Sequence, residues 1–293
     1  MTREPAPRRW VLQRAPVAWS PARIGRAAVR ALHHEAVLYP KPGLVSAMDA
    51  GAHGDMSLAT FYRSIVALRS YFPTIAALGA AGAPWQSLAA HGQAAEAVML
   101  RATGGVNTHR GAIFHLGLVC AAAGALAASG AGPSPRAVCA VVRTMYAPRF
   151  RAVSVPGSHG AMVARRYGAG GARAEAASGF GAVRRWSLPA FRQALAATGD
   201  RDRAAVHAIF ALIARVEDSN LLWRGGRSGL VFAQQWAQRF LQAGGALAPH
   251  WRDQAMRAHD AFVLRGLSPG GSADLLAVTL LLHALGEEAC PAL

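Results

Sequence analysis

The residues best equipped for chemistry lie together in residues 103–110, which read Thr-Gly-Gly-Val-Asn-Thr-His-Arg. Adjacent glycines let the main chain come close to a ligand, and an apolar run over residues 112–128 follows at once. If that run is a helix, its first N–H groups and the positive end of its dipole face the polar residues, which suits an anion. A plain helix cap would need only one or two polar residues, so the stretch predicts an anion-binding site. Its candidate binding residues are Thr103, Gly104, Gly105, Asn107, Thr108 and Arg110.

Carboxylates are scarce in this chain, with 15 Asp and Glu, so their positions are informative. Asp49 and Asp55 flank His53, and Glu217 and Asp218 stand side by side. Oxygen ligands of this kind suit Mg²⁺, which proteins typically hold with one or two carboxylates plus substrate phosphates. The sequence therefore predicts a magnesium and polyphosphate site with these four acids as candidate ligands.

Each of these acids also has an alternative role that is purely structural. Asp55 could cap the helix expected two residues later, and Asp274 could cap the last helix. Glu217 and Asp218 could form a solvated helix end, although the nearby Asn220 and a Gly-Gly pair at 225–226 favour a site.

The histidines divide into two groups. His53, His109 and His159 stand beside glycines in polar segments, where a catalytic or phosphate-binding role is reasonable. Three others lie within apolar runs and are expected to be core residues: His115, His207 and His283. No His-x-x-x-His pattern with a carboxylate supports a zinc site.

Five polar, glycine-marked segments fall at expected helix ends, over residues 41–56, 103–110, 157–160, 217–226 and 268–274. Helical folds form sites where helix termini converge, because unpaired N–H groups and helix dipoles are available there. We therefore expect one composite pocket. Arg110 and Arg224 are the arginines best placed to grip a phosphate with two guanidinium nitrogens.

Composition excludes several other classes of protein. The chain has 31 Lys and Arg against 15 acids, but its arginines are scattered and Lys41 is the only lysine. No strand interleaves basic and aromatic residues as single-stranded nucleic-acid binders do, so we expect no nucleic-acid role. Three widely spaced cysteines, Cys120, Cys139 and Cys290, fit a reducing cytoplasm and no disulfide framework. Residues 112–131 could span a bilayer by length, but their Ala and Gly content and His115 favour a buried helix and no membrane role.

The pattern of apolar residues predicts an all-α fold of one domain over residues 20–293, behind a poorly structured extension over residues 1–19. No segment alternates convincingly between apolar and polar residues, and no repeat is visible. Helices are expected over residues 20–39, 57–78 with a kink at Pro73, 85–101, 112–128, 134–146, 188–197, 200–216, 229–243, 249–265 and 272–285. Residues 156–181 are expected to be a glycine-rich loop with a short helix in it.

These segments, in this order, resemble the triphosphoribosyl-dephospho-coenzyme A synthase family over residues 24–286. The shared motifs are Pro-Lys-Pro-Gly-Leu-Val at 40–45, Gly-Ala-His at 51–53 with an Asp at 55, residues 103–114, Gly-Ser-His-Gly at 157–160, Asp-Ser-Asn-Leu-Leu at 218–222 with Arg-Gly-Gly at 224–226, and Ser-Pro-Gly-Gly-Ser-Ala-Asp-Leu-Leu at 268–276. The resemblance implies an enzyme that joins ATP to 3′-dephospho-CoA and releases adenine. Its product would be 2′-(5″-triphosphoribosyl)-3′-dephospho-CoA, the prosthetic-group precursor for certain acyl carrier proteins.

Such a reaction needs the 2′-hydroxyl of dephospho-CoA to attack C1′ of the ATP ribose while adenine leaves. The sugar gains oxocarbenium character, so the reaction calls for a carboxylate base, an acid for the leaving group and a firmly held triphosphate. We hypothesise that Lys41 and residues 103–110 hold the triphosphate and that Asp49, Asp55 or Asp218 binds Mg²⁺ or acts as the base. His109 or His53 is the candidate acid. Further ligand-binding candidates are Asn220, Arg224, Ser268, Gly270 and Gly271.

The resemblance also suggests a pathway and partners. In the citrate lyase branch an Asp commonly follows Gly-Leu-Val and a His precedes the Arg-Gly-Gly; here those positions are Ser46 and Trp223. These departures favour the malonate decarboxylase branch. Partners would be ATP, 3′-dephospho-CoA, the downstream phosphoribosyl-dephospho-CoA transferase and the acyl carrier protein, and a homodimer stays open. Two alternatives are a helical Mg²⁺-dependent nucleotide hydrolase and a non-enzymatic scaffold that binds the carrier protein.

Overall fold

The computed structural model describes residues 19–151 and 159–287, and these residues form helices and connecting loops with no strand. The predicted all-α fold class is confirmed. The predicted extension is described only at its last residue, Trp19, and Gly157 and Cys290 lie outside the described residues.

The α-helices, in chain order, are α1 (Pro21–Val37), α2 (Leu58–Leu68), α3 (Tyr71–Ala80), α4 (Trp85–Ala102), α5 (Arg110–Ala128), α6 (Pro135–Val141), α7 (Ala147–Arg151), α8 (His159–Tyr167), α9 (Gly171–Ala177), α10 (Leu188–Thr198), α11 (Arg201–Ile213), α12 (Ser219–Gln242), α13 (Trp251–Leu264) and α14 (Gly270–Glu287). Two π-helical segments, η1 (Val142–Tyr146) and η2 (Val183–Ser187), lead into α7 and α10, and a 3-10 turn, η3 (Gly245–Leu247), follows α12.

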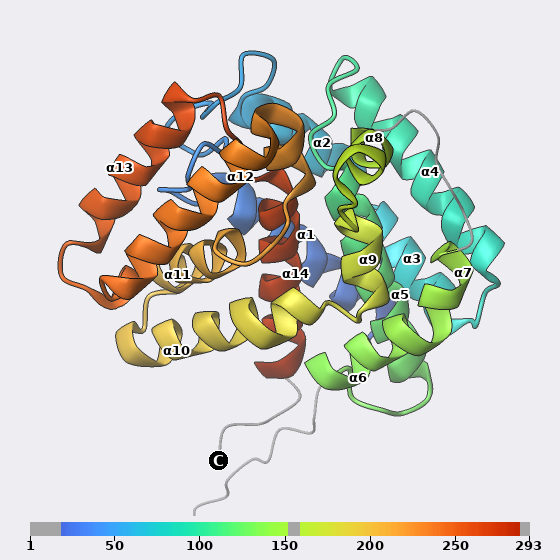
Figure 1. The fold of residues 1–293 in the computed structure, drawn as a ribbon. Coiled ribbons are helices and arrows are strands. Elements are labelled where there is room, and N and C mark those ends of the chain that lie inside the picture. Colours follow the sequence, from blue (N-terminus) through green and yellow to red (C-terminus); the bar gives the residue numbers. More distant parts are fainter. Residues whose placement is uncertain (1–18, 152–158, 288–293) are drawn as a thin grey trace, which may run out of the picture.

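Two helices, α5 and α14, are apolar on almost every side and form the centre of the bundle. A helix without a polar face must be buried, and α14 packs against α1, α5 and α11, as Figure 1 shows near the middle of the molecule. By length and composition α5 could cross a membrane, but 67% of its apolar window is buried inside the bundle. That degree of burial is the pattern of a core helix, as the sequence predicts.

Glycines bring α3 and α5 into close contact. A Cβ atom at Gly79 would lie 2.1 Å from the carbonyl oxygen of Ala121, and one at Gly124 would lie 2.0 Å from that of Ala76. Each glycine therefore allows the backbone of the other helix to approach more closely than any side chain would permit. This contact fixes the inner part of α5, whose first turn belongs to the site described below.

The prediction of one kinked helix over residues 57–78 is wrong. The chain ends α2 at Leu68 and begins α3 at Tyr71, so that Pro73 stands in the first turn of α3. A proline ring collides with the carbonyl of the residue four positions earlier, which here is Arg69, and proline is tolerated in a first turn where its missing N–H would have no partner. The helix breaks before Pro73 and does not bend through it.

Residues 156–181, predicted as a glycine-rich loop with one short helix, hold two short helices in their described part. Residues 159–167 and 171–177 form α8 and α9. Gly168, Gly171 and Gly179 have positive φ angles at or beside the helix ends, where glycine stops a helix without weakening its interior. Alanine-rich sequence between them is free to be helical.

The helix expected from residue 229 begins ten residues earlier, because Asp218 caps it at Ser219. Gly226, with φ 62° and ψ −161°, interrupts α12 and divides it into two helical parts. The other predicted starts agree with the structure, where Ser20, Ser134 and Asp200 each cap their helix by accepting a backbone N–H in the first turn.

Candidate functional site

The first turns of three helices, α5, α12 and α14, meet the loop between α1 and α2. Asp218 links α12 to α14 by accepting the Ser272 N–H, and Asp274 of α14 accepts the Ala112 N–H of α5. His53 of the loop lies 2.8 Å from the Ser268 hydroxyl. Three of the five predicted polar segments are thus joined by direct contacts, and a fourth, residues 103–110, leads into the first turn of α5, which Asp274 contacts. Convergence of helix N-termini gathers N–H groups and positive dipole ends, which suits a polyanion.

Asp218 connects α12 and α14 through five hydrogen bonds. Its Oδ1 accepts the N–H groups of Asn220 at 2.9 Å, Leu221 at 3.4 Å and Gly271 at 3.3 Å. Its Oδ2 accepts from Ser272, from the N–H at 2.7 Å and from the hydroxyl at 2.9 Å. Burial raises the pKa of Asp218, and these hydrogen bonds oppose the rise. The carboxylate is therefore engaged as a shared cap, which leaves little capacity for a metal ion.

Lys41 is fully buried and paired inside the protein. Its Nζ donates to the Glu35 carboxylate at 2.7 Å and also to the backbone carbonyl of Glu35 at the end of α1. Burial lowers the pKa of Lys41, and Glu35 counteracts that effect. The only lysine of the chain therefore lies beneath the surface of the site and influences it through its charge.

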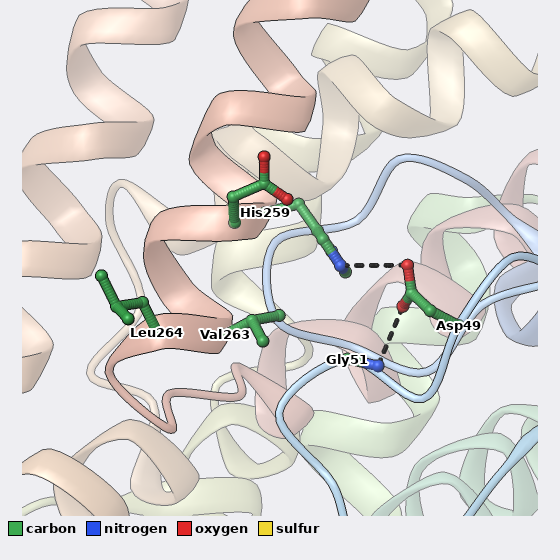
Figure 2. Close-up of a pocket in the computed structure, with 6 residues that line it drawn as sticks. Asp49, Gly51, His259, Val263 and Leu264 are labelled. Atoms are coloured by element: carbon green, nitrogen blue, oxygen red, sulfur yellow. Dashed lines mark hydrogen bonds and ion pairs between the residues drawn. The ribbon is translucent and has the colours of Figure 1, made fainter.

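The loop over residues 41–56 is further held by α13. The buried His259 of α13 has Nδ1 2.6 Å from the carbonyl oxygen of Lys41 and Nε2 3.2 Å from Asp49 Oδ2. Asp49 Oδ1 accepts the N–H of Gly51 at 2.9 Å. Figure 2 shows Asp49 between His259 and Gly51. These residues line a hollow of about 400 Å³ together with Val263 and Leu264 of α13. Asp49 is thus engaged in holding the loop.

The 103–110 segment is built as a turn between α4 and α5. The Thr103 hydroxyl donates to the carbonyls of Met99 and Val106, which closes the end of α4. Gly104 and Gly105 have positive φ angles of 68° and 89°, and no atom lies within 4 Å of a Cβ built on either. The main chain at this turn is therefore not covered by other parts of the described structure.

The last residues of this segment prepare the start of α5. Asn107 accepts the N–H of Arg110 at 3.1 Å, and Arg110 pairs with Glu96 at 3.0 Å on the protein surface. Thr108 has a buried hydroxyl oxygen with no hydrogen-bond partner among the described residues. A buried polar atom without a partner costs free energy, so this hydroxyl is ready for a ligand.

His109 is buried under the turn. Its Nδ1 lies 2.6 Å from the Ser64 hydroxyl, its ring packs edge-on against Phe61, and its Nε2 has no partner among the described residues. Burial, with the charge of Lys41, lowers the pKa of His109 to about 3. The imidazole is therefore neutral at pH 7 and cannot give up a proton as an imidazolium.

His53 and Arg224 form a second polar cluster with the loop. Arg224 donates to the carbonyls of Ala52 and Gly266 at 3.0 and 3.1 Å and lies 3.0 Å from His53 Nδ1. Burial and Arg224 lower the pKa of His53, against the opposing effect of Asp55, whose carboxylate lies 3.6 Å away. The Asp55 side chain is itself 63% exposed, compared with 40% for that of Asp49.

The remaining predicted residues have plain positions. Glu217 is exposed at the start of α12. Asn220 lies against Gly270, where a Cβ on the glycine would be 2.7 Å from the Asn220 amide nitrogen. A Cβ at Gly271 would lie 3.1 Å from Asp218. Both glycines therefore permit the close crossing of α12 and α14.

No group of three or more His, Cys, Asp or Glu side chains within the described ranges could hold a metal ion by itself. The four predicted ligands do not gather into a protein cage. Asp55 and Glu217 have exposed carboxylates, which fits an ion that is shared with substrate phosphates.

The three histidines assigned to the core are buried in their helices: His115, His207 and His283. Sequence reasoning missed Glu35, the partner of Lys41, and His259. It also treated Asp274 only as a cap for its own helix, whereas the structure places it against α5. The only sign of Glu35 and His259 in the sequence is that each is a polar residue among apolar ones. A single sequence does not show whether such a side chain is buried or exposed to solvent.

Known proteins resemble this chain over most of its length. A family model described as CitG, ATP:dephospho-CoA triphosphoribosyl transferase, matches residues 21–291. A 2-(5''-triphosphoribosyl)-3'-dephosphocoenzyme-A synthase of Klebsiella pneumoniae is 44% identical over 88% of this chain and 89% of its own. A probable synthase of the same name from Pectobacterium carotovorum is 42% identical over 89% and 88%, and one from Acinetobacter calcoaceticus is 38% identical over 91% and 92%. No solved structure matches the chain.

Proposed function

Since the chain belongs to the CitG family of ATP:dephospho-CoA triphosphoribosyl transferases, we propose that it joins ATP to 3′-dephospho-CoA and releases adenine. The observation that carries the proposal is the meeting of the α5, α12 and α14 N-termini, with an open glycine turn leading into α5. Such a site grips a polyanion by backbone N–H groups and leaves the ribose beyond it free to react.

The triphosphate would lie over residues 103–110. Gly104 and Gly105 leave the main chain accessible, and the Thr108 hydroxyl has no protein partner among the described residues. Arg110 is on the surface and held by a single ion pair with Glu96, so it can exchange that partner for a phosphate. Lys41 would contribute its charge from inside while remaining bound to Glu35.

Mg²⁺ would be held by Asp55 together with triphosphate oxygens, because Asp218 and Asp49 already have other partners. The ion would supply charge neutralisation to the triphosphate. Because the Asp55 carboxylate is exposed, it would also accept the proton of the attacking 2′-hydroxyl. His53, held by Ser268 and Arg224, would position Asp55 through its ring.

We further propose that the product supplies the acyl carrier protein of a malonate decarboxylase. Ser46 and Trp223 stand where the citrate lyase branch commonly has Asp and His. Ser46 is buried and its hydroxyl accepts the N–H groups of Met48 and Asp49, so a carboxylate in its place would alter the turn that presents Asp49.

One assay tests the reaction. Purified protein is incubated with ATP and Mg²⁺, with and without 3′-dephospho-CoA, and adenine is measured by chromatography. Adenine that forms only with both substrates supports the proposal. Phosphate or ribose triphosphate formed without dephospho-CoA would indicate a nucleotide hydrolase. The absence of any turnover would favour a non-enzymatic scaffold that binds the carrier protein.

Asp55→Asn tests the assignment of the exposed acid. It should abolish adenine release while the far-ultraviolet circular dichroism spectrum stays unchanged. Asp253→Asn, at an exposed acid in the first turn of α13, is the matched control and should keep full activity. Near-normal turnover of the Asp55 variant would remove Asp55 from the mechanism.

A further inference from the structure

The hollow between the loop over residues 41–56 and α13 has the dimensions of a ligand site. Its volume of about 400 Å³ is in the range of small-molecule sites, roughly 300–1,000 Å³. Two lining side chains are apolar and reach into solvent, Val263 at 38% and Leu264 at 88% exposure. Figure 2 shows both on α13, with Asp49 and Gly51 of the loop facing that helix. These neighbouring apolar residues offer a contact surface that the fold itself leaves uncovered.

The rest of the lining carries negative charge. Asp49 and Asp260 both line the hollow, and Asp260 is exposed. Asp49 accepts the N–H of Gly51 at Oδ1, 2.9 Å away, and its Oδ2 lies 3.2 Å from His259 Nε2. A carboxylate has about four lone-pair sites on its two oxygens, so both acids can accept further N–H or O–H groups, whereas they repel phosphate. The hollow therefore suits a neutral, partly apolar segment that carries hydrogen-bond donors.

The hollow adjoins the cluster of His53 and Arg224. Gly51 in its lining is two residues before His53 in the same loop. Arg224 donates to the carbonyl of Ala52 at 3.0 Å and to that of Gly266 at 3.1 Å, so it joins the loop to the segment that follows α13. Arg224 is exposed and its charge lies beside His53. A ligand with an anionic group at Arg224 can therefore continue into the hollow.

We propose that this hollow binds the pantetheine arm of 3′-dephospho-CoA. The inference rests on the proposed function and assigns a subsite to the acceptor substrate. Dephospho-CoA consists of an adenosine that carries the attacking 2′-hydroxyl, a diphosphate, and an arm that is neutral. The proposed base Asp55 places the adenosine next to His53, the diphosphate follows at Arg224, and the arm is the segment that enters the hollow.

The arm matches the lining group by group. It has two methyl groups on one carbon, a hydroxyl and two amides. The methyl groups pack on Val263 and Leu264, and the apolar surface buried there favours binding. The hydroxyl and the amide N–H groups donate to Asp49 and Asp260. ADP is the same nucleotide without the arm, so Val263 and Leu264 are specificity-determining residues that distinguish dephospho-CoA from ADP.

Isothermal titration calorimetry of the full-length protein tests this assignment with 3′-dephospho-CoA, ADP, and ATP with Mg²⁺. Val263→Trp fills the hollow and should raise the Kd for dephospho-CoA by about tenfold or more, a loss of at least about 1.4 kcal/mol. Leu264→Ala removes one apolar wall and should raise that Kd by about three- to fivefold. Neither ADP nor ATP carries the arm, so their Kd values should change by less than about twofold.

Val66→Trp is the matched control, because Val66 is an exposed valine of α2 that does not line the hollow. It should leave the Kd values of all three ligands unchanged. Circular dichroism should show the helical content of the parent protein in every variant. Leu264 is the most exposed large apolar side chain of the described residues, so Leu264→Ala decides the question if Val263→Trp does not fold.

An unchanged Kd for dephospho-CoA in both variants would overturn the proposal, as would equal rises for dephospho-CoA and ADP. A parent protein that does not bind dephospho-CoA would overturn it as well. The proposed function is judged separately, by adenine release. A parent protein that loses affinity for dephospho-CoA through Val263→Trp but releases no adenine refutes the proposed function alone. A parent protein that releases adenine while both variants keep its affinity refutes only this inference.

Discussion

Replacing Asp218 should cost more folding stability than replacing any other candidate acid, because two helices share it as a cap. Its carboxylate accepts three short hydrogen bonds, from Asn220 N at 2.9 Å, Ser272 N at 2.7 Å and the Ser272 hydroxyl at 2.9 Å. The two bonds beyond 3.2 Å, from Leu221 and Gly271, are weaker. Asp218→Ala would leave these donors without a protein acceptor at the junction of α12 and α14.

The magnitude follows from those bonds. A buried donor left without its partner costs about 1–3 kcal/mol, so three such donors give roughly 3–9 kcal/mol. Water that enters reduces this cost toward the lower end. We therefore expect Asp218→Ala to lower the free energy of unfolding by about 4 kcal/mol. Asp218→Asn keeps one acceptor oxygen and is a good N-cap, so its cost should be about half as large.

Urea unfolding followed by circular dichroism measures this difference, with adenine release recorded for the same samples below the unfolding transition. The expected order of stability is parent, Asn variant, Ala variant. A cost below about 1 kcal/mol for Asp218→Ala would refute the double-cap reasoning. If activity disappeared from a variant of unchanged stability, Asp218 would instead serve as the metal ligand or base that the sequence suggests.

Three further predictions test the interior of the fold. Lys41→Met should destabilise the protein by about 3–5 kcal/mol because it leaves the Glu35 carboxylate buried without its partner, and adding Glu35→Met should restore most of that loss in urea unfolding; equal costs for the single and double variants would contradict the pairing. Burial lowers the pKa of His115 from 6.5 to about 4, so the unfolded chain takes up a proton first, and this group should remove about 2 kcal/mol of stability between pH 7 and pH 5; His115→Gln should flatten that part of the pH–stability curve, and an unchanged slope would count against it. Gly79→Ala should lower the unfolding temperature by more than 8 °C because its Cβ would lie 2.1 Å from a carbonyl oxygen of α5, whereas Gly92→Ala, whose nearest neighbour would be 3.8 Å away, should keep or raise it.

The start of α12 illustrates what local sequence can and cannot predict. The sequence predicts a helix only from residue 229 and assigns the Gly-Gly pair at 225–226 to a polar segment of the site. In the structure Gly226 takes a positive φ that breaks the helical pattern for one residue only. Asp218, four residues before Leu222, begins the helix because donors on both α12 and α14 converge on it. The sequence of α12 alone does not show that Asp218 also accepts hydrogen bonds from Ser272 of α14.

Asp274 shows the same limit at the site. Its position in the sequence suggests a cap for the last helix, and that interpretation is local. The structure instead places its carboxyl against Gly111, 163 positions away in the chain, where a glycine is required. Lys41 is a further case. A single lysine in a polar loop suggests a residue on the surface that binds a ligand, but Lys41 is buried and paired with Glu35 in the last turn of α1.

The sequence by itself determined the helical class, most helix boundaries and the segments that form the site, because apolar periodicity, caps and glycine-marked polar runs are local properties. The tertiary structure alone decided which of those polar residues are satisfied and which remain available. Asp218, Asp49 and Lys41 find partners in other helices, while the Thr108 hydroxyl and the Nε2 atom of His109 have no partner among the described residues and keep capacity for a substrate. Partnership and burial depend on contacts between distant parts of the chain, and they set the protonation state on which the chemistry depends.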